Sequence, residues 1–365
     1  MTLTEASYYF RKYLPFAVAG FLILLIVFYI FKLLFIYIAS LDKKQTIVLK
    51  EIEGIEGFKL EKPQFLSNTV TDSQGIKFTL DTPEGSPIEA SEAATVYYVP
   101  PTSGKIVNKS KAESMAAQAR FGFAKTMQKK VDSKNNKYIF SDTMRKLEID
   151  LTNFNFTYKY EMKKDENLFA KVKMTSETDT KNRAIEFLKS MGKYPEELAQ
   201  GQINVIYIDY DQATDTSTIV KRSQDANMIE VDFFRADFGD TQIATPTFFN
   251  SQNYIMLVPQ ETDYQLVAAQ VNFFEKSTDL TGTYALKTGA EAWEELTAGN
   301  GDVVYNQGNK TSIIIRKMQL RYYDPDVYQQ TIQPVFVFLG DNFAAYVPAL
   351  KESYYQTEDM TQSSE

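Results

Sequence analysis

A long apolar run near the N-terminus limits what the first part of this 365-residue chain can become. No charged residue interrupts the run from Leu14 to Phe31, and only Lys32 separates it from a second apolar stretch that ends at Leu41. A helix needs about 20 apolar residues to cross the hydrocarbon core of a bilayer. A buried helix of a globular protein rarely stays apolar for so long. The run therefore predicts a transmembrane helix over residues 14–41.

An uncleaved signal anchor fits this run better than a cleaved signal peptide. A signal peptide has an apolar region of about 7–15 residues followed by a small-x-small cleavage site, and Tyr37-Ile-Ala39 matches that site poorly. Basic residues flank the run on both sides, at Arg11 and Lys12 and again at Lys43 and Lys44, so the positive-inside rule is nearly balanced. We expect a cytoplasmic tail over residues 1–13 and an extracytoplasmic remainder.

The distribution of charge supports this orientation. Residues 1–41 contain Arg11, Lys12 and Lys32 against Glu5, so in a chain of net charge −8 the remaining residues carry −10. An acidic domain of this kind repels nucleic acids and anionic lipid surfaces. We therefore expect the bilayer itself and a membrane protein as partners, and no nucleic acid.

The composition removes several classes of chemistry, because the chain has no cysteine and no histidine. Disulfides, thiol catalysis and the commonest zinc ligand are excluded, as is the usual general base. The acids Asp209, Asp211 and Asp215 lack the glycine and the glutamate of a calcium loop, and Asp324-Pro-Asp326 is typical of a turn between strands. We interpret these acids as surface residues and predict no catalytic, cofactor-binding or metal-binding residues, and no cofactor.

Beyond the apolar run, three short helical patterns alternate with long β-rich stretches. The helices are expected at 111–120, 180–191 and 290–296. The strands alternate, as in Met228-Ile-Glu-Val-Asp-Phe-Phe234, which indicates a sheet with one solvated face. This pattern predicts an α+β fold with helices packed on antiparallel sheets. The expected parts are a juxtamembrane β segment (42–105), first α+β modules (106–280), a C-terminal α+β module (281–350) and a disordered tail (351–365).

The segment from Val335 to Phe338 is apolar at every position, which is more than a half-buried strand requires. Such a run favours a strand that is covered on both faces. We expect the helix at 290–296 to cover one of these faces, with Trp293 as its large anchor.

Three short motifs match, in order, those of penicillin-binding proteins and serine β-lactamases: Ser190-Met-Gly-Lys193, Ser251-Gln-Asn253 and Lys287-Thr-Gly289. That mechanism needs the serine at the start of a helix, with the lysine one turn later. Here Ser190 is expected at the end of a helix, because Gly192 and Pro195 follow it. We interpret the match as coincidence and expect the protein not to be an enzyme.

The C-terminal strands resemble those of a known family. A Tyr-rich strand, Ile313 to Tyr323, is followed by Gln333-Pro-Val-Phe-Val-Phe338 and then by Phe343-Ala-Ala-Tyr-Val-Pro-Ala349. This region resembles the closing strands of the YycH/YycI-type regulators, which are membrane-anchored partners of a two-component sensor kinase. The resemblance is specific over about residues 285–350 and architectural elsewhere. It implies one N-terminal span, tandem PepSY-like helix-plus-sheet modules, no catalytic residues, and action by contact.

Two functions follow from this reasoning. The first is a single-pass, membrane-anchored, extracytoplasmic, non-enzymatic protein that modulates an envelope partner, such as a sensor kinase or a homologous regulator, as a homodimer or heterodimer. The alternative is a structural or assembly component of the cell envelope that binds peptide or glycan. A groove lined by Tyr and Phe would favour the alternative, whereas a self-complementary face would favour the first.

Overall fold

The computed structural model describes residues 14, 18, 20–35, 47–65, 70–101, 108–121, 127–261 and 263–355. The chain divides into two compact units, Met1–Val48 and Leu49–Glu365. In the first unit, residues 20–35 are helical. No helix among the described residues is both long and apolar enough to span a membrane. The expected tail (1–13) and the last part of the expected span (36–41) lie outside the described residues, so the anchor stays a prediction.

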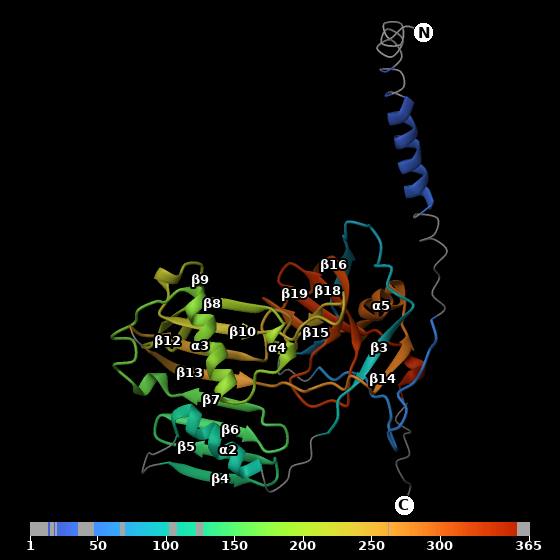
Figure 1. The fold of residues 1–365 in the computed structure, drawn as a ribbon. Coiled ribbons are helices and arrows are strands. Elements are labelled where there is room, and N and C mark those ends of the chain that lie inside the picture. Colours follow the sequence, from blue (N-terminus) through green and yellow to red (C-terminus); the bar gives the residue numbers. More distant parts are fainter. Residues whose placement is uncertain are drawn as a thin grey trace, which may run out of the picture. The chain divides into compact units, whose positions relative to one another are not determined.

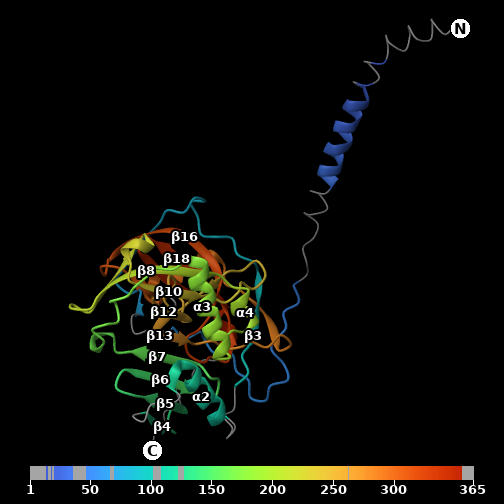
Figure 2. The same cartoon turned by 60° about the vertical axis from the view of Figure 1, so that its left-hand side comes forward.

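The second unit is a mixed α+β structure in which sheets predominate, and its larger sheet has nine strands. All neighbouring strands in this sheet run antiparallel, in the order β4-β5-β6-β7-β13-β12-β10-β8-β9 (Figure 2). The strands are β4 (Gln128–Asp132), β5 (Lys137–Ser141), β6 (Arg145–Asp150), β7 (Phe156–Tyr160), β8 (Ile203–Asp211), β9 (Thr216–Val220), β10 (Met228–Phe233), β12 (Tyr254–Pro259) and β13 (Tyr264–Val271).

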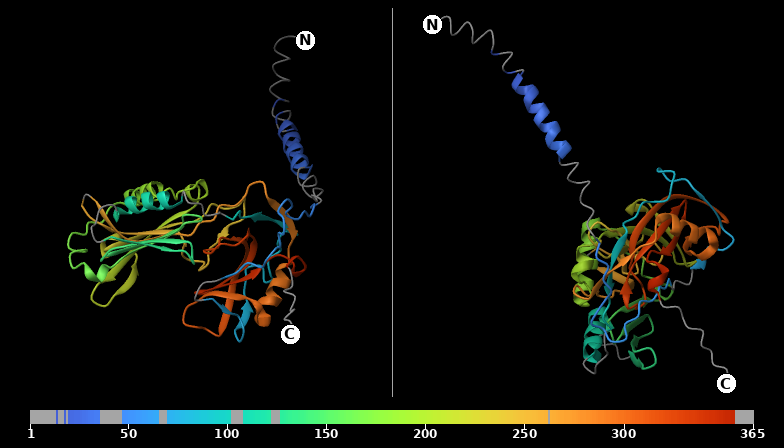
Figure 3. Two further views of the ribbon diagram at one scale, coloured as in Figure 1. Left: turned by 90° about the horizontal axis from the view of Figure 1, so that it is seen from below. Right: turned by 90° about the vertical axis from the view of Figure 1, so that its right-hand side faces the viewer.

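Helices cover one face of this sheet (Figure 3, left). They are α2 (Asn108–Ala116), which continues into a π-helical turn (Ala117–Phe121), α3 (Glu177–Ser190) and the short α4 (Glu196–Ala199). Helix α3 begins earlier than its apolar spacing predicts, because the Ser176 hydroxyl accepts a hydrogen bond from the Asp179 N–H and caps it. It ends where Gly192 takes a φ of +65°. Its residues Ala184, Phe187 and Leu188 pack into the core under the helices.

A smaller seven-stranded sheet and a three-stranded sheet form the rest of the second unit (Figure 1). The seven strands are β1 (Thr71–Asp72), β2 (Lys77–Leu80), β11 (Ile243–Ala244), β15 (Asp302–Asn306), β16 (Ser312–Tyr323), β18 (Pro334–Gly340) and β19 (Phe343–Pro348). The three strands are β3 (Ala93–Tyr98), β14 (Thr281–Ala285) and β17 (Thr331–Ile332). Helix α5 (Gly289–Glu295), with a π-helical turn (Leu296–Asn300), packs on this part. A helix thus precedes a set of antiparallel strands three times: α2, α3 and α5.

The described strands of the expected juxtamembrane β segment (42–105) join the C-terminal sheets. Strand β1 pairs with β15, β2 pairs in parallel with β16, and β3 lies between β14 and β17. The pairing partners all come from residues 281–332, so the early strands complete the C-terminal sheets. Sequence could not show this, because strands about 200 residues apart meet only in the folded chain.

Strand β18 confirms the prediction of cover on both faces. Phe336 and Phe338 belong to one apolar cluster together with Trp293 of α5, and the rings of Trp293 and Phe338 lie 6.1 Å apart, centre to centre. Val335 and Val337 point into a different cluster on the opposite face. All four side chains are fully buried.

The first part of the expected disordered tail is structured. Residues Glu352–Tyr354 form a 3₁₀ turn, and Tyr355 is buried and donates a hydrogen bond to the Gln333 side chain. Glu352 accepts hydrogen bonds from Lys287 and pairs with Lys62. The polar composition of this segment concealed these contacts. Residues 356–365 lie outside the described residues.

Candidate functional site

The residues of the three penicillin-binding-type motifs are each held by other partners. The Ser190 hydroxyl donates to the Phe187 carbonyl at 2.7 Å, and the Lys193 ammonium donates to the Asn153 carbonyl at 3.2 Å. Burial lowers the pKa of Lys193 to about 8. The Ser251 hydroxyl donates to the Phe233 carbonyl at 2.6 Å, and Lys287 pairs with two glutamates beside α5. These side chains serve as local structural contacts.

The acids of the calcium-like stretch are also used locally. Asp211 accepts a hydrogen bond from the Ala213 N–H, and Asp215 accepts one from the Tyr210 hydroxyl and pairs with Lys163. Asp209 accepts from the Asn227 side chain. In the part of the chain that the structure describes, no group of three or more acidic side chains could hold a metal ion.

Asp324 corrects our interpretation of the acids as surface residues. It follows strand β16, as expected for a connection, but only 1% of it is exposed. Its carboxylate accepts a hydrogen bond from Arg235 Nε at 2.8 Å and another from Gln252 Nε2 at 2.7 Å. A buried carboxylate is stable only when it is paired in this way. The sequence contained no local signal for this, because Arg235 lies 89 positions away.

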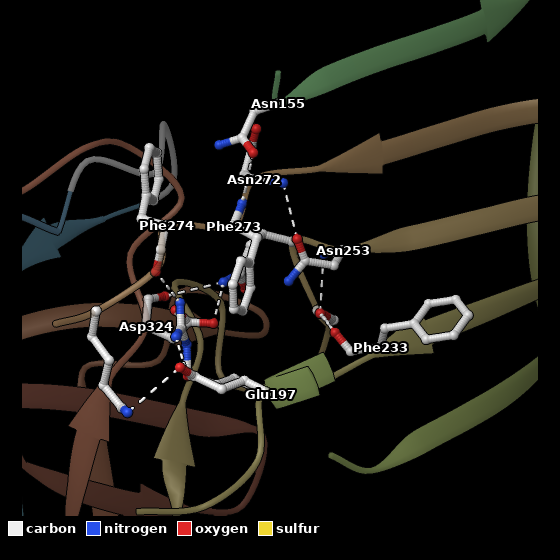
Figure 4. A network of polar contacts seen from close by, with 12 residues as sticks. Asn155, Glu197, Phe233, Asn253, Asn272, Phe273, Phe274 and Asp324 are labelled. Atoms are coloured by element: carbon white, nitrogen blue, oxygen red, sulfur yellow. Dashed lines mark hydrogen bonds and ion pairs between the residues drawn. The ribbon is translucent and has the colours of Figure 1, made fainter. Parts of the chain in front are cut away.

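Arg235 is the centre of a buried polar network. Figure 4 labels its partners Glu197, Phe274 and Asp324. Besides the bond to Asp324, the guanidinium donates a hydrogen bond to the carboxylate of Glu197 in α4. It donates another to the Phe274 carbonyl at 2.6 Å. It also stacks 4.0 Å from the centre of the Phe273 ring. The five-donor fork of arginine suits such a multiple contact. Because Arg235 follows β10 of the nine-stranded sheet and Asp324 follows β16 of the smaller sheet, the network joins the two sheets.

Beside this network lies a cleft of about 800 Å³ between the two sheets, which we call the inter-sheet cleft. Strands β10, β12 and β13 contribute one wall, through the face that α2 and α3 leave uncovered, and strands β1 and β15 contribute to the other. The volume is in the range of small-molecule binding sites. The cleft is therefore the main candidate for a functional site in the described part of the chain.

Three kinds of side chain dominate the lining of the cleft. The aromatic residues are Phe249, Tyr254 and Tyr305. The carboxamides are Asn250, Gln252, Gln270, Asn306 and Asn309. The acids are Glu230 and Asp326. None of the described residues that line the cleft is a lysine or an arginine.

Glu230, which lines the cleft, and its fully buried neighbour Asp232 form a carboxyl pair on β10. They occupy alternate positions of β10, so they share the sheet face opposite to the helix-covered Ile229 and Val231. Burial, and then the negative charge of Glu230, raise the pKa of Asp232 to about 8. Burial also raises the pKa of Glu230. The pair therefore holds a proton at neutral pH, as two adjacent carboxyls do when both cannot ionise.

Two oxygen atoms of the cleft residues have no hydrogen-bond partner in the described part of the chain. They are Oε1 of Gln252 and Oδ1 of Asp326. Gln252 is 6% exposed, and its amide orientation is set by the bond from Nε2 to Asp324. Both atoms are closed off from solvent, so they are a cost to the fold and not acceptors that the cleft exposes.

The alternation of apolar and acidic residues in β10 was visible in the sequence, but the burial of its acidic face was not. The pattern correctly places Ile229, Val231 and Phe233 on the covered face. The opposite face was expected to be solvated, whereas Asp232 is fully buried. Two acids at positions i and i+2 of one strand were the only available signal for the carboxyl pair.

Comparison with known proteins does not assign the chain to a family. No protein-family model and no curated protein matches the sequence. Among solved structures, an uncharacterized protein from Eubacterium rectale matches with a TM-score of 0.34 and 12% identity, covering 74% of this chain and 87% of that chain. The Bacillus megaterium YpeB C-terminal domain matches with a TM-score of 0.29 and 11% identity, covering 70% and 96%. Likeness of this size decides neither family nor function.

Proposed function

We propose that this chain is a single-pass, membrane-anchored, extracytoplasmic protein that acts by binding and not by catalysis. In this proposal its helix-plus-sheet units are PepSY-like, and the domain modulates an envelope partner, such as a two-component sensor kinase, by direct contact. The observation that carries the binding role is the inter-sheet cleft, in which side chains of both sheets converge. The apolar run over residues 14–41 and the acidic remainder of the chain support the location.

A specific observation also favours the alternative, an envelope component that binds peptide or glycan. The cleft is lined by Tyr254, Tyr305 and Phe249, which is the aromatic groove that this alternative requires. The two functions are compatible in one protein, since a ligand held between two sheets can alter the surface offered to a partner.

The absence of cysteine from the chain permits a direct test of location. A single cysteine at Thr218, an exposed position of β9, reports on the domain, and a single cysteine at Ser7 reports on the tail. We expect Thr218→Cys to react with a membrane-impermeant maleimide in intact cells, and Ser7→Cys to react only after the cells are permeabilised. The reverse pattern, or labelling of neither variant before permeabilisation, would refute the proposed orientation.

The partner can be tested in the same cysteine-free background. A photo-crosslinker placed at Thr218 or at other exposed positions should trap the same membrane protein from intact cells in repeated experiments. Crosslinks that spread evenly over abundant membrane proteins would contradict a specific contact.

A further inference from the structure

We infer that the inter-sheet cleft binds a neutral, hydroxyl-rich oligosaccharide. This inference rests on the proposed binding function and deepens it by naming the class of ligand. It is carried by the volume of the cleft and by the residue types of its lining.

The charge of the lining excludes anionic ligands first. Phosphates and carboxylates are recognised by arginine, lysine or helix N-termini. The described lining has no basic side chain, and it contains the carboxyls Glu230 and Asp326. A phosphorylated or acidic ligand would therefore find no cation in the described lining of the cleft, whereas a neutral ligand needs none.

The polar groups that remain suit hydroxyls. Each carboxamide offers two donors and one acceptor oxygen, and each sugar hydroxyl is both a donor and an acceptor. Five carboxamides line the cleft. Together they can exchange hydrogen bonds with several hydroxyls of one ligand.

The aromatic residues provide the apolar part of such a site. The rings of Phe249 and Tyr305 meet edge to face, with centres 4.8 Å apart, and Phe249 is 48% exposed. Tyr254 comes from the opposite wall, on β12. The flat C–H face of a pyranose ring packs against an aromatic ring while its equatorial hydroxyls point sideways to polar groups, so rings and carboxamides together are suited to sugars.

An oligomer fits the cleft better than a single sugar does. A cavity of about 330 Å³ shares Asp326 with the cleft, and another of about 340 Å³ shares Phe249. These two cavities contain basic side chains, Lys137 in one and Arg321 in the other, so the neutral site is the cleft itself. Its volume of about 800 Å³ provides room for more than one sugar unit.

The wall formed by β10 and β12 is poorly matched to a peptide. Extended peptides bind by adding a strand to a free sheet edge. Strands β10 and β12 are interior strands, since each has a hydrogen-bonded neighbour on both sides. They present side chains to the cleft, not a row of free backbone groups.

The test is binding of neutral oligosaccharides to the full-length protein in lipid nanodiscs, measured by calorimetry. Alkyl maltoside detergents must be avoided, because their head group is itself a disaccharide. The probes are chitotetraose and cellotetraose, with a tetrameric hyaluronan fragment as the anionic comparison. We expect saturable binding of at least one neutral probe and at least tenfold weaker binding of the anionic one.

Variants then assign the binding to the cleft. Phe249→Ala and Tyr305→Leu should each weaken binding of the neutral probe at least tenfold. Ile219→Ala, at an exposed apolar residue of β9, is the matched control and should bind as the unaltered protein does. Circular dichroism of each variant checks that a loss of binding is not a loss of fold.

The inference is overturned if neither neutral probe binds, if the folded Phe249→Ala and Tyr305→Leu variants bind normally, or if the hyaluronan fragment binds as tightly as the neutral probes. It is also overturned if a neutral extended peptide displaces the sugar at equal concentration. None of these outcomes affects the cysteine-labelling test, so failure of the glycan site and failure of the membrane-anchored function can be told apart.

Discussion

Replacing Asp232 with asparagine should remove a pH dependence from the stability of the domain. Asp232 is fully buried in β10, beside Glu230, and its pKa is raised from 3.8 to about 8. In the unfolded chain the carboxyl ionises near its ordinary pKa. Between about pH 4 and pH 8 the folded state therefore holds a proton that the unfolded state has lost. Raising the pH in this window favours unfolding, so the contribution of Asp232 to stability falls as the pH rises.

The size of the effect follows from the shift. One titrating group changes the free energy of unfolding by at most about 1.4 kcal/mol per pH unit. Over the three pH units from pH 5 to pH 8, the free energy of unfolding therefore changes by at most about 4 kcal/mol. Asp232→Asn leaves Glu230 in place, and burial raises the pKa of Glu230 as well, so part of the pH dependence remains in the variant. We therefore expect a difference of about half the upper bound, or about 2 kcal/mol. Asparagine keeps an oxygen that can accept the bond from the Ser251 N–H and gains an amide that can donate to Glu230.

The assay is urea unfolding of the fragment 49–365 at pH 5, 6, 7 and 8, followed by the fluorescence of Trp293, the only tryptophan. Relative to the Asp232→Asn variant, the unaltered fragment should lose about 2 kcal/mol of unfolding free energy between pH 5 and pH 8. Asp209→Asn, which replaces an exposed aspartate of the neighbouring strand β8, is the control and should show no such difference. A difference between the fragment and Asp232→Asn that stays constant with pH, or one that changes in the opposite direction, would refute the idea that the pair holds a proton.

The same unfolding assay, at pH 7, tests three further expectations. Arg235→Met should lower the free energy of unfolding by about 3–5 kcal/mol, because it leaves Asp324 buried without its cation. Adding Asp324→Leu should restore part of this loss. If the double variant recovers nothing, the ion pair is not the main contribution of Arg235. Phe336→Ala should cost about 3–5 kcal/mol, since the ring is fully buried in the cluster beside α5, and a cost below about 1 kcal/mol would contradict that packing. Ending the chain after Leu350 should lower the free energy of unfolding, because it removes the buried Tyr355. Ending the chain after Tyr355 keeps that residue and should lower the free energy of unfolding less.

Local patterns of the sequence predicted much of the second unit. The three helices, the alternation of β10 and the double burial of β18 were all visible, because side-chain periodicity and capping residues act over a few positions. The α+β class followed from the succession of these elements. The apolar run over residues 14–41 predicts a membrane anchor for the same local reason, and this remains to be tested.

The site was decided by contacts between residues that are distant in the sequence. Burial turned Asp324 from an expected turn residue into an ion-pair partner of Arg235. It also brought Glu230 into a wall of the cleft, beside the buried Asp232. The pairing of β1 with β15 placed an early segment opposite that wall. Whether a carboxyl is solvated, paired or protonated depends on the dielectric and the charges around it in the folded state. A sequence determines which groups are present and the local structures they prefer, whereas only the tertiary structure determines which of these groups lose their water together.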